Sequence, residues 1–155
     1  HSAGVISQDS GTMYIAPAAV GANVGVAPSL NIDKSTTSFY LSGGQLWLAT
    51  LTPPQITGPQ DDWNPTGLAG AVILFVTSDA ARIINGMQGG TDGRVIWFAN
   101  IGSFIVRLGH QIGTSGAANR FTCPNLVNYD IINGGGVMVA YDGTNSRWRV
   151  VGPVA

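Results

Sequence analysis

The sequence contains no glutamate, one lysine and one cysteine, and only 10% of its 155 residues are charged. The formal net charge is −1, and the six arginines are spread along the chain, so the basic cluster typical of a nucleic-acid-binding surface is lacking. With 45% hydrophobic residues the chain is too apolar for a disordered protein. Because a monomer normally keeps a charged surface, this composition indicates that part of the surface is buried against other subunits.

Long apolar runs are also absent. The longest one, residues 68–76, is far shorter than the roughly 20 residues of a membrane-spanning helix, so no membrane insertion is expected. The chain begins at His1 without a Met, a basic region or an apolar stretch, which does not fit a signal peptide. Cys123 has no partner for an intrachain disulfide, and we expect it to be a small buried side chain.

Helical periodicity is nearly absent, and short apolar segments recur about every ten residues between Gly-rich and Asp-rich turns. This spacing is typical of an all-β protein, and it predicts an antiparallel β-sandwich or a jelly-roll-like domain. The four prolines of residues 52–65 predict an extended, solvent-facing connection. We therefore expect an extended N-terminal arm or small β segment over residues 1–58, used for attachment, and a compact β domain over residues 59–155.

Motifs for catalysis, cofactors and metals are weak. Asp61 and Asp62 are adjacent, so their side chains diverge in an extended chain, and loop capping is expected in place of a Ca²⁺ site. His110 is not accompanied by a nucleophile elbow, and the glycine-rich residues 86–93 lack a phosphate-binding pattern. The sequence therefore predicts no catalytic, cofactor-binding or metal-binding residue.

The segment RVIWFAN, residues 94–100, would be apolar on both sides if it formed a strand. Val95, Trp97 and Ala99 would lie on one side, and Ile96 and Phe98 on the other. We expect one side of this strand to contact a second sheet and the other to contact a neighbouring subunit. Arg107 interrupts an apolar run, and two arginines flank Trp148, so these charged residues are candidates for a seam between subunits. The predicted interface residues are Arg107, Ile96, Phe98, Arg147 and Arg149. The predicted buried anchors are Trp97, Phe98, Phe104, Val106, Val139 and Trp148.

Three aromatic residues, Trp47, Trp63 and Tyr40, are candidates for contacts with a glycan, because ring faces suit the apolar faces of sugars. The alternative for each of them is aromatic packing in a core or an interface, which is the more common use of such side chains.

Four blocks stand in a distinctive order: DDWNPTGL, SDAARIINGMQGGTDGRVIWFANIG, GTSGAANRFTCP and GGGVMVAYDGTNSRWRVVG. This pattern, over residues 61–152, resembles a β domain of virion proteins of tailed bacteriophages, which occurs in head and tail fibres, appendages and capsid-surface components. The resemblance implies a domain that commonly forms trimers and works by assembly or attachment, without cofactors. It therefore predicts a non-enzymatic structural protein of the virion surface, a homo-oligomer that contacts capsid or fibre-base proteins. The alternative is a receptor-binding tip that recognises a glycan of the host surface.

Overall fold

The computed structural model describes residues 47–152, which lie within one compact unit, Gln45–Ala155. This part is all-β, as predicted, and its only helical segments are three short 3-10 turns. The strands are β1 (Thr50–Leu51), β2 (Ile73–Val76), β3 (Arg82–Ile84), β4 (Val95–Asn100), β5 (Val106–Leu108), β6 (Phe121–Thr122), β7 (Tyr129–Ile131), β8 (Gly136–Asp142) and β9 (Arg147–Val151). The 3-10 turns are η1 (Leu68–Gly70), η2 (Ala117–Asn119) and η3 (Pro124–Leu126).

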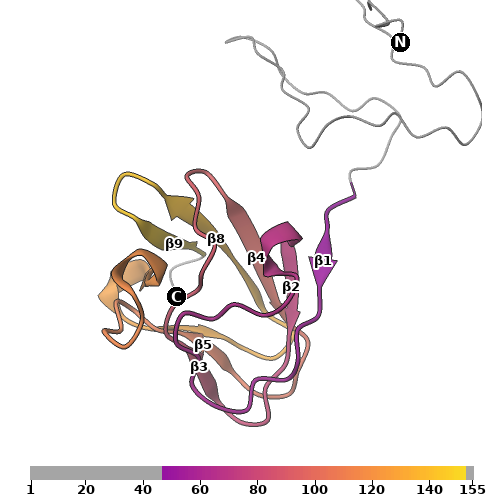
Figure 1. The fold of residues 1–155 in the computed structure, drawn as a ribbon. Helices are drawn as coiled ribbons and strands as arrows, with labels where there is room; N and C mark the ends of the chain where they lie inside the picture. The colour runs from indigo at the N-terminus through magenta and orange to yellow at the C-terminus, as the bar shows by residue number, and fades with distance from the viewer. Residues whose placement is uncertain (1–46, 153–155) are drawn as a thin grey trace, which may run out of the picture. The chain divides into compact units, whose positions relative to one another are not determined.

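The strands form a six-stranded sheet in the order β1-β2-β4-β8-β9-β6 and a three-stranded sheet in the order β3-β5-β7 (Figure 1). From β2 to β5 the chain alternates between the two sheets, and each strand that returns to a sheet runs in the same direction as the previous strand of that sheet. As a result β1, β2 and β4 are parallel neighbours, and so are β3 and β5. The prediction of an antiparallel domain is therefore wrong: both sheets are mixed, and a strand of the other sheet serves as the crossover that elsewhere is usually a helix.

The proline-rich connection lies along the smaller sheet. Isolated parallel bridges join Ile56, Gln60 and Trp63 to Ser78, Ile84 and Met87, respectively. Ile56 and Trp63 are buried, so the predicted solvent-facing connection is wrong for these positions, although the segment is extended. The bridges fall between the prolines, where backbone N–H groups are available. The predicted boundary between residues 58 and 59 thus lies inside the compact unit, and residues 1–46 of the predicted arm lie outside the described residues.

One hydrophobic core receives side chains from both sheets. Leu74, Phe98 and Val139 come from the larger sheet, and Ile84 and Val106 from the smaller one, all at most 1% exposed. Burial of this kind removes apolar surface from water and is the main favourable contribution to folding.

Among the predicted anchors, Phe98, Val106, Val139 and Trp148 are confirmed as buried. Trp148 is completely buried, its indole N–H donates to the Met87 carbonyl oxygen at 2.7 Å, and its ring meets the Tyr141 ring edge-on with a centroid distance of 5.1 Å. The predictions for Trp97 and Phe104 are wrong, because these side chains are 46% and 48% exposed.

The end of β4 is tied to the smaller sheet by a buried amide. Asn100 donates from Nδ2 to the Phe104 and Ile131 carbonyl oxygens, at 2.8 and 2.9 Å, and accepts the Gly102 N–H at its Oδ1 atom. A buried polar group that satisfies three backbone groups fixes the position of the loop after β4.

Candidate functional site

The outer side of the six-stranded sheet is apolar over β2, β4 and the adjoining parts of β8 and β9, and it is charged beyond them, at Asp142, Arg147 and Arg149. The register places Ile73, Trp97, Met138 and Val151 side by side on β2, β4, β8 and β9. Trp97 and Val151 are 46% and 48% exposed, whereas the residues on either side of Trp97 in the chain are buried. The alternation along β4 therefore turns Trp97 away from the core.

Further partly exposed apolar residues extend this row on the same side of the sheet. We define the outer apolar face as the residues Ile73, Phe75, Val95, Trp97, Ala99, Met138, Ala140 and Val151. None of these side chains carries a charge or a hydroxyl or amide group. Most sheets with one side in water alternate apolar and polar residues. Strand β9 follows this rule at Arg147 and Arg149, whereas β2 and β4 do not.

A shallow hollow of about 420 Å³ opens beside Trp97 on this face, between β4 and β8. Ala99 and Gly136, which are opposite each other in the register, are among the residues that line it. A Cβ atom at position 136 would lie 2.7 Å from the Phe98 carbonyl oxygen, so the backbone there admits only glycine. The hollow exists because the side chains at these two positions are small or absent.

The three-stranded sheet differs on its outer side. There Arg107 of β5 pairs with Asp130 of the neighbouring strand β7, with a distance of 2.5 Å between Nε and Oδ1. This ion pair lowers the pKa of Asp130 and raises that of Arg107 through hydrogen bonding and charge attraction. Arg107 thus has a partner within its own chain, so the reason for predicting it at a subunit interface does not hold.

The prediction of Ile96 and Phe98 as interface residues is wrong. Both point into the core and are at most 1% exposed, so a partner cannot reach their side chains. The prediction that β4 has two apolar sides is correct, but the side that faces outward carries Val95, Trp97 and Ala99.

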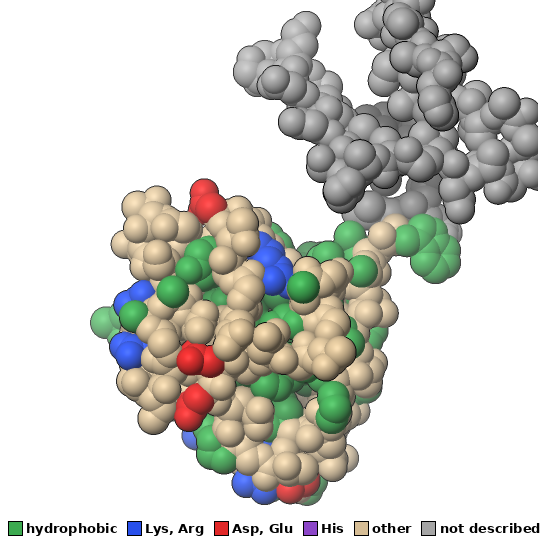
Figure 2. Space-filling model, viewed as in Figure 1, with side chains coloured by type: hydrophobic (Ala, Val, Ile, Leu, Met, Phe, Trp, Pro, Cys, Tyr) green, Lys and Arg blue, Asp and Glu red, His purple; other side chains and the backbone are tan. Residues whose placement is uncertain are grey.

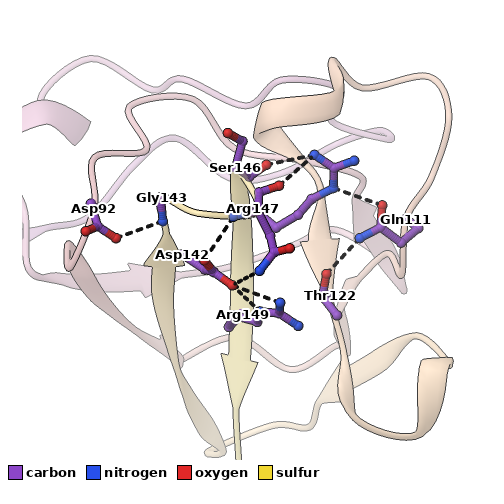
Figure 3. A network of polar contacts seen from close by, with 9 residues as sticks. Asp92, Gln111, Thr122, Asp142, Gly143, Ser146, Arg147 and Arg149 are labelled. Atoms are coloured by element: carbon purple, nitrogen blue, oxygen red, sulfur yellow. Dashed lines mark hydrogen bonds and ion pairs between the residues drawn. The ribbon is translucent and has the colours of Figure 1, made fainter.

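Arg147 and Arg149 support the turn between β8 and β9 (Figure 3). Arg149 contacts the Asp142 carboxylate at 2.8 Å, and Arg147 donates to Gln111 Oε1 at 3.1 Å and to the Ser146 carbonyl oxygen at 2.8 Å. The pKa of Asp142 is lowered to about 2, first by the Asn145 side chain and backbone N–H and then by Arg149. Both arginines are engaged within the chain, and a role for them between subunits stays a prediction.

The three candidate glycan contacts have different environments. Trp63 is buried and stacks on Phe98 with ring centroids 6.2 Å apart, so its prediction as a sugar contact is wrong. Trp47 is 85% exposed, and Tyr40 lies outside the described residues.

Asp61 and Asp62 lie at a second hollow, of about 450 Å³, and bind the loop of residues 114–119 through hydrogen bonds. Asp61 accepts hydrogen bonds from the Thr114 hydroxyl and from Asn85 Nδ2, and these contacts lower its pKa. Asp62 accepts the Gly116 N–H and the Asn119 amide. Within residues 47–152, no group of three or more His, Cys, Asp or Glu side chains is arranged to hold a metal ion.

Sequence reasoning missed the outer apolar face as a unit, above all Ile73 and Met138. The alternation within residues 71–76 and 136–142 was the available signal, but it does not reveal which strands become neighbours. On the side of the molecule drawn in Figure 2, charged side chains are scattered among polar and apolar ones. No helix in the described part is long and apolar enough to cross a membrane.

Comparison of the chain with protein-family models, curated proteins and solved structures finds no match.

Proposed function

We propose that this chain is a non-enzymatic structural protein of a bacteriophage virion surface, a capsid decoration or fibre component that acts by assembling into a homo-oligomer, most simply a trimer. Its two mixed sheets, which share one core, form the β-sandwich-like body of the assembled unit. The low charge of the sequence and its four-block resemblance to phage virion domains support this role.

The observation that carries the proposal is the outer apolar face. The largest contiguous apolar patch on a protein surface is often the site of an interaction. Trp97, Val95 and Val151 are all more than a third exposed there. Assembly would remove this surface from water, at a gain of roughly 25 cal/mol for each Å² that is buried.

Residues 1–46 are the proposed attachment segment to other virion proteins, such as a capsid or fibre-base protein. This shortens the predicted arm, since residues 47–58 belong to the compact unit. Only three charged residues, Asp9, Asp33 and Lys34, occur in this segment. Such a segment suits burial along another protein, where extended backbone adds hydrogen bonds.

Immunogold labelling of purified particles of the encoding phage tests the role. Labels over the capsid lattice or along fibres support a structural component, and labels only at a tail or fibre tip favour the receptor-binding alternative. Absence of the protein from purified particles contradicts both. A chain reduced to residues 47–155 should retain its β circular dichroism and fail to join particles. Incorporation of this variant at normal occupancy would contradict the attachment role of residues 1–46.

A further inference from the structure

We infer that the outer apolar face is the contact surface between copies of this chain, and that Trp97 of one copy occupies the hollow beside Gly136 of another. The inference rests on the proposed homo-oligomer and identifies the surface that forms it.

The shape of the face supports this arrangement. Trp97 is a large, half-exposed side chain, and the hollow of about 420 Å³ lies directly beside it on the same sheet. A surface that carries both a projecting ring and an adjacent hollow can place the ring of one copy in the hollow of the next, which is the head-to-tail kind of contact that a trimer requires. Aromatic and Met side chains, here Trp97, Phe75 and Met138, are enriched in the buried centres of protein interfaces.

The chemistry of the face argues against other occupants. A glycan needs several hydrogen-bonding partners for its hydroxyl groups, and the eight side chains of the face offer one strong donor, the indole N–H of Trp97. A nucleic acid or an anionic membrane needs cations. The charged residue beside the face on β9, Arg149, is already paired with Asp142. An uncharged, apolar face requires an equally apolar partner, and each further copy presents one.

The size of the face limits the contact that it can form alone. Its side chains extend over residues 73–75, 95–99, 138–140 and 151, which at about 3.3 Å per residue and about 4.8 Å between strands gives a flat area of about 200 Å². Two such areas bury on the order of 400 Å², less than the roughly 1,200 Å² of a stable interface. A persistent assembly therefore buries further surface around the face, which provides its apolar centre.

The test measures the mass of the full-length chain by sedimentation equilibrium over a range of concentrations. Trp97→Lys places a charge at the centre of the face, and Ala99→Phe fills the hollow while the face remains apolar. Val127→Lys is the matched control, because Val127 is an exposed apolar residue with extended backbone in the loop between β6 and β7. Circular dichroism and the thermal midpoint of each variant establish that it is folded.

We expect Trp97→Lys and Ala99→Phe each to raise the concentration for half-assembly about 30-fold or more, as for a central interface residue, and Val127→Lys to leave it unchanged. If the wild-type chain assembles and both folded face variants retain its mass, the inferred surface is wrong and the homo-oligomer stands. If only Ala99→Phe assembles like the wild-type chain, Trp97 does not occupy the hollow. If Val127→Lys weakens assembly as much as the two face variants do, the effect is not specific to the face. A monomeric wild-type chain contradicts the proposed oligomer itself.

Discussion

Replacement of Trp148 by Ala should destabilise the fold by about 3 to 5 kcal/mol, the range for large-to-small changes of buried aromatic residues. The side chain is completely buried, and roughly 200 Å² of apolar surface at about 25 cal/mol per Å² accounts for most of this free energy. The change also leaves the Met87 carbonyl oxygen without its donor, which costs about 1 kcal/mol or more. Trp148→Phe retains a ring next to Tyr141 but lacks the N–H group, so a smaller loss of about 2 kcal/mol is expected.

Urea unfolding followed by circular dichroism measures these free energies. Trp97→Ala is the matched control, since the same side chain is removed from a half-exposed position on the outer side of the sheet. At concentrations at which the chain is monomeric, it should cost less than about 1 kcal/mol. Similar losses for Trp148→Ala and Trp97→Ala would refute the assignment of the two tryptophans to opposite sides of the larger sheet.

Three further predictions concern single residues. Asn100→Leu should cost about 2 to 4 kcal/mol, because two backbone groups of the loop after β4 and one of β7 lose their partner, and a normal unfolding midpoint would contradict this role. Burial raises the pKa of the Cys123 thiol to about 11, so it should resist Ellman's reagent at pH 8 in the folded protein and react in urea; rapid reaction without denaturant would show that the thiol is accessible. The Asp142 pKa is depressed to about 2, so its contribution to stability is complete above the unfolded-state value of about 3.8 and is lost as the pH falls through about 2. A carboxyl NMR titration with a midpoint near 4 would contradict the contacts of Asp142.

The local patterns of the sequence were sufficient for the strands and for the all-β class. Alternation in residues 94–100 identified one central strand, and short apolar segments between turns indicated the others. The parallel pairs were not predictable in the same way. Strand direction depends on the path between two sheets, and the single bridges of the proline-rich segment leave almost no local signal.

When both sides of a strand are apolar, the local sequence pattern does not show which side faces the core. In β4 the period of two separates Ile96 and Phe98 from Val95 and Trp97, but either set could be the buried one. The neighbours of the strand decide it: Ile96 is opposite Val139 and Phe98 is opposite Val137, and these partners are buried with them. The sequence prediction therefore assigned two core residues, Ile96 and Phe98, to an interface.

The charged side chains show a similar limit. Arg107 was an isolated cation in an apolar run, and its partner Asp130 is 23 residues away in the sequence. Only the register of β5 with β7 brings the two together.

The central claim is that this chain functions as an assembly of its own copies, and its mass in solution is the most direct test. Sedimentation equilibrium of the full-length wild-type chain at micromolar concentration should give a multiple of the 16.0 kDa of one chain, with three copies as the expected number. A single species of 16.0 kDa at every concentration tested would contradict the account.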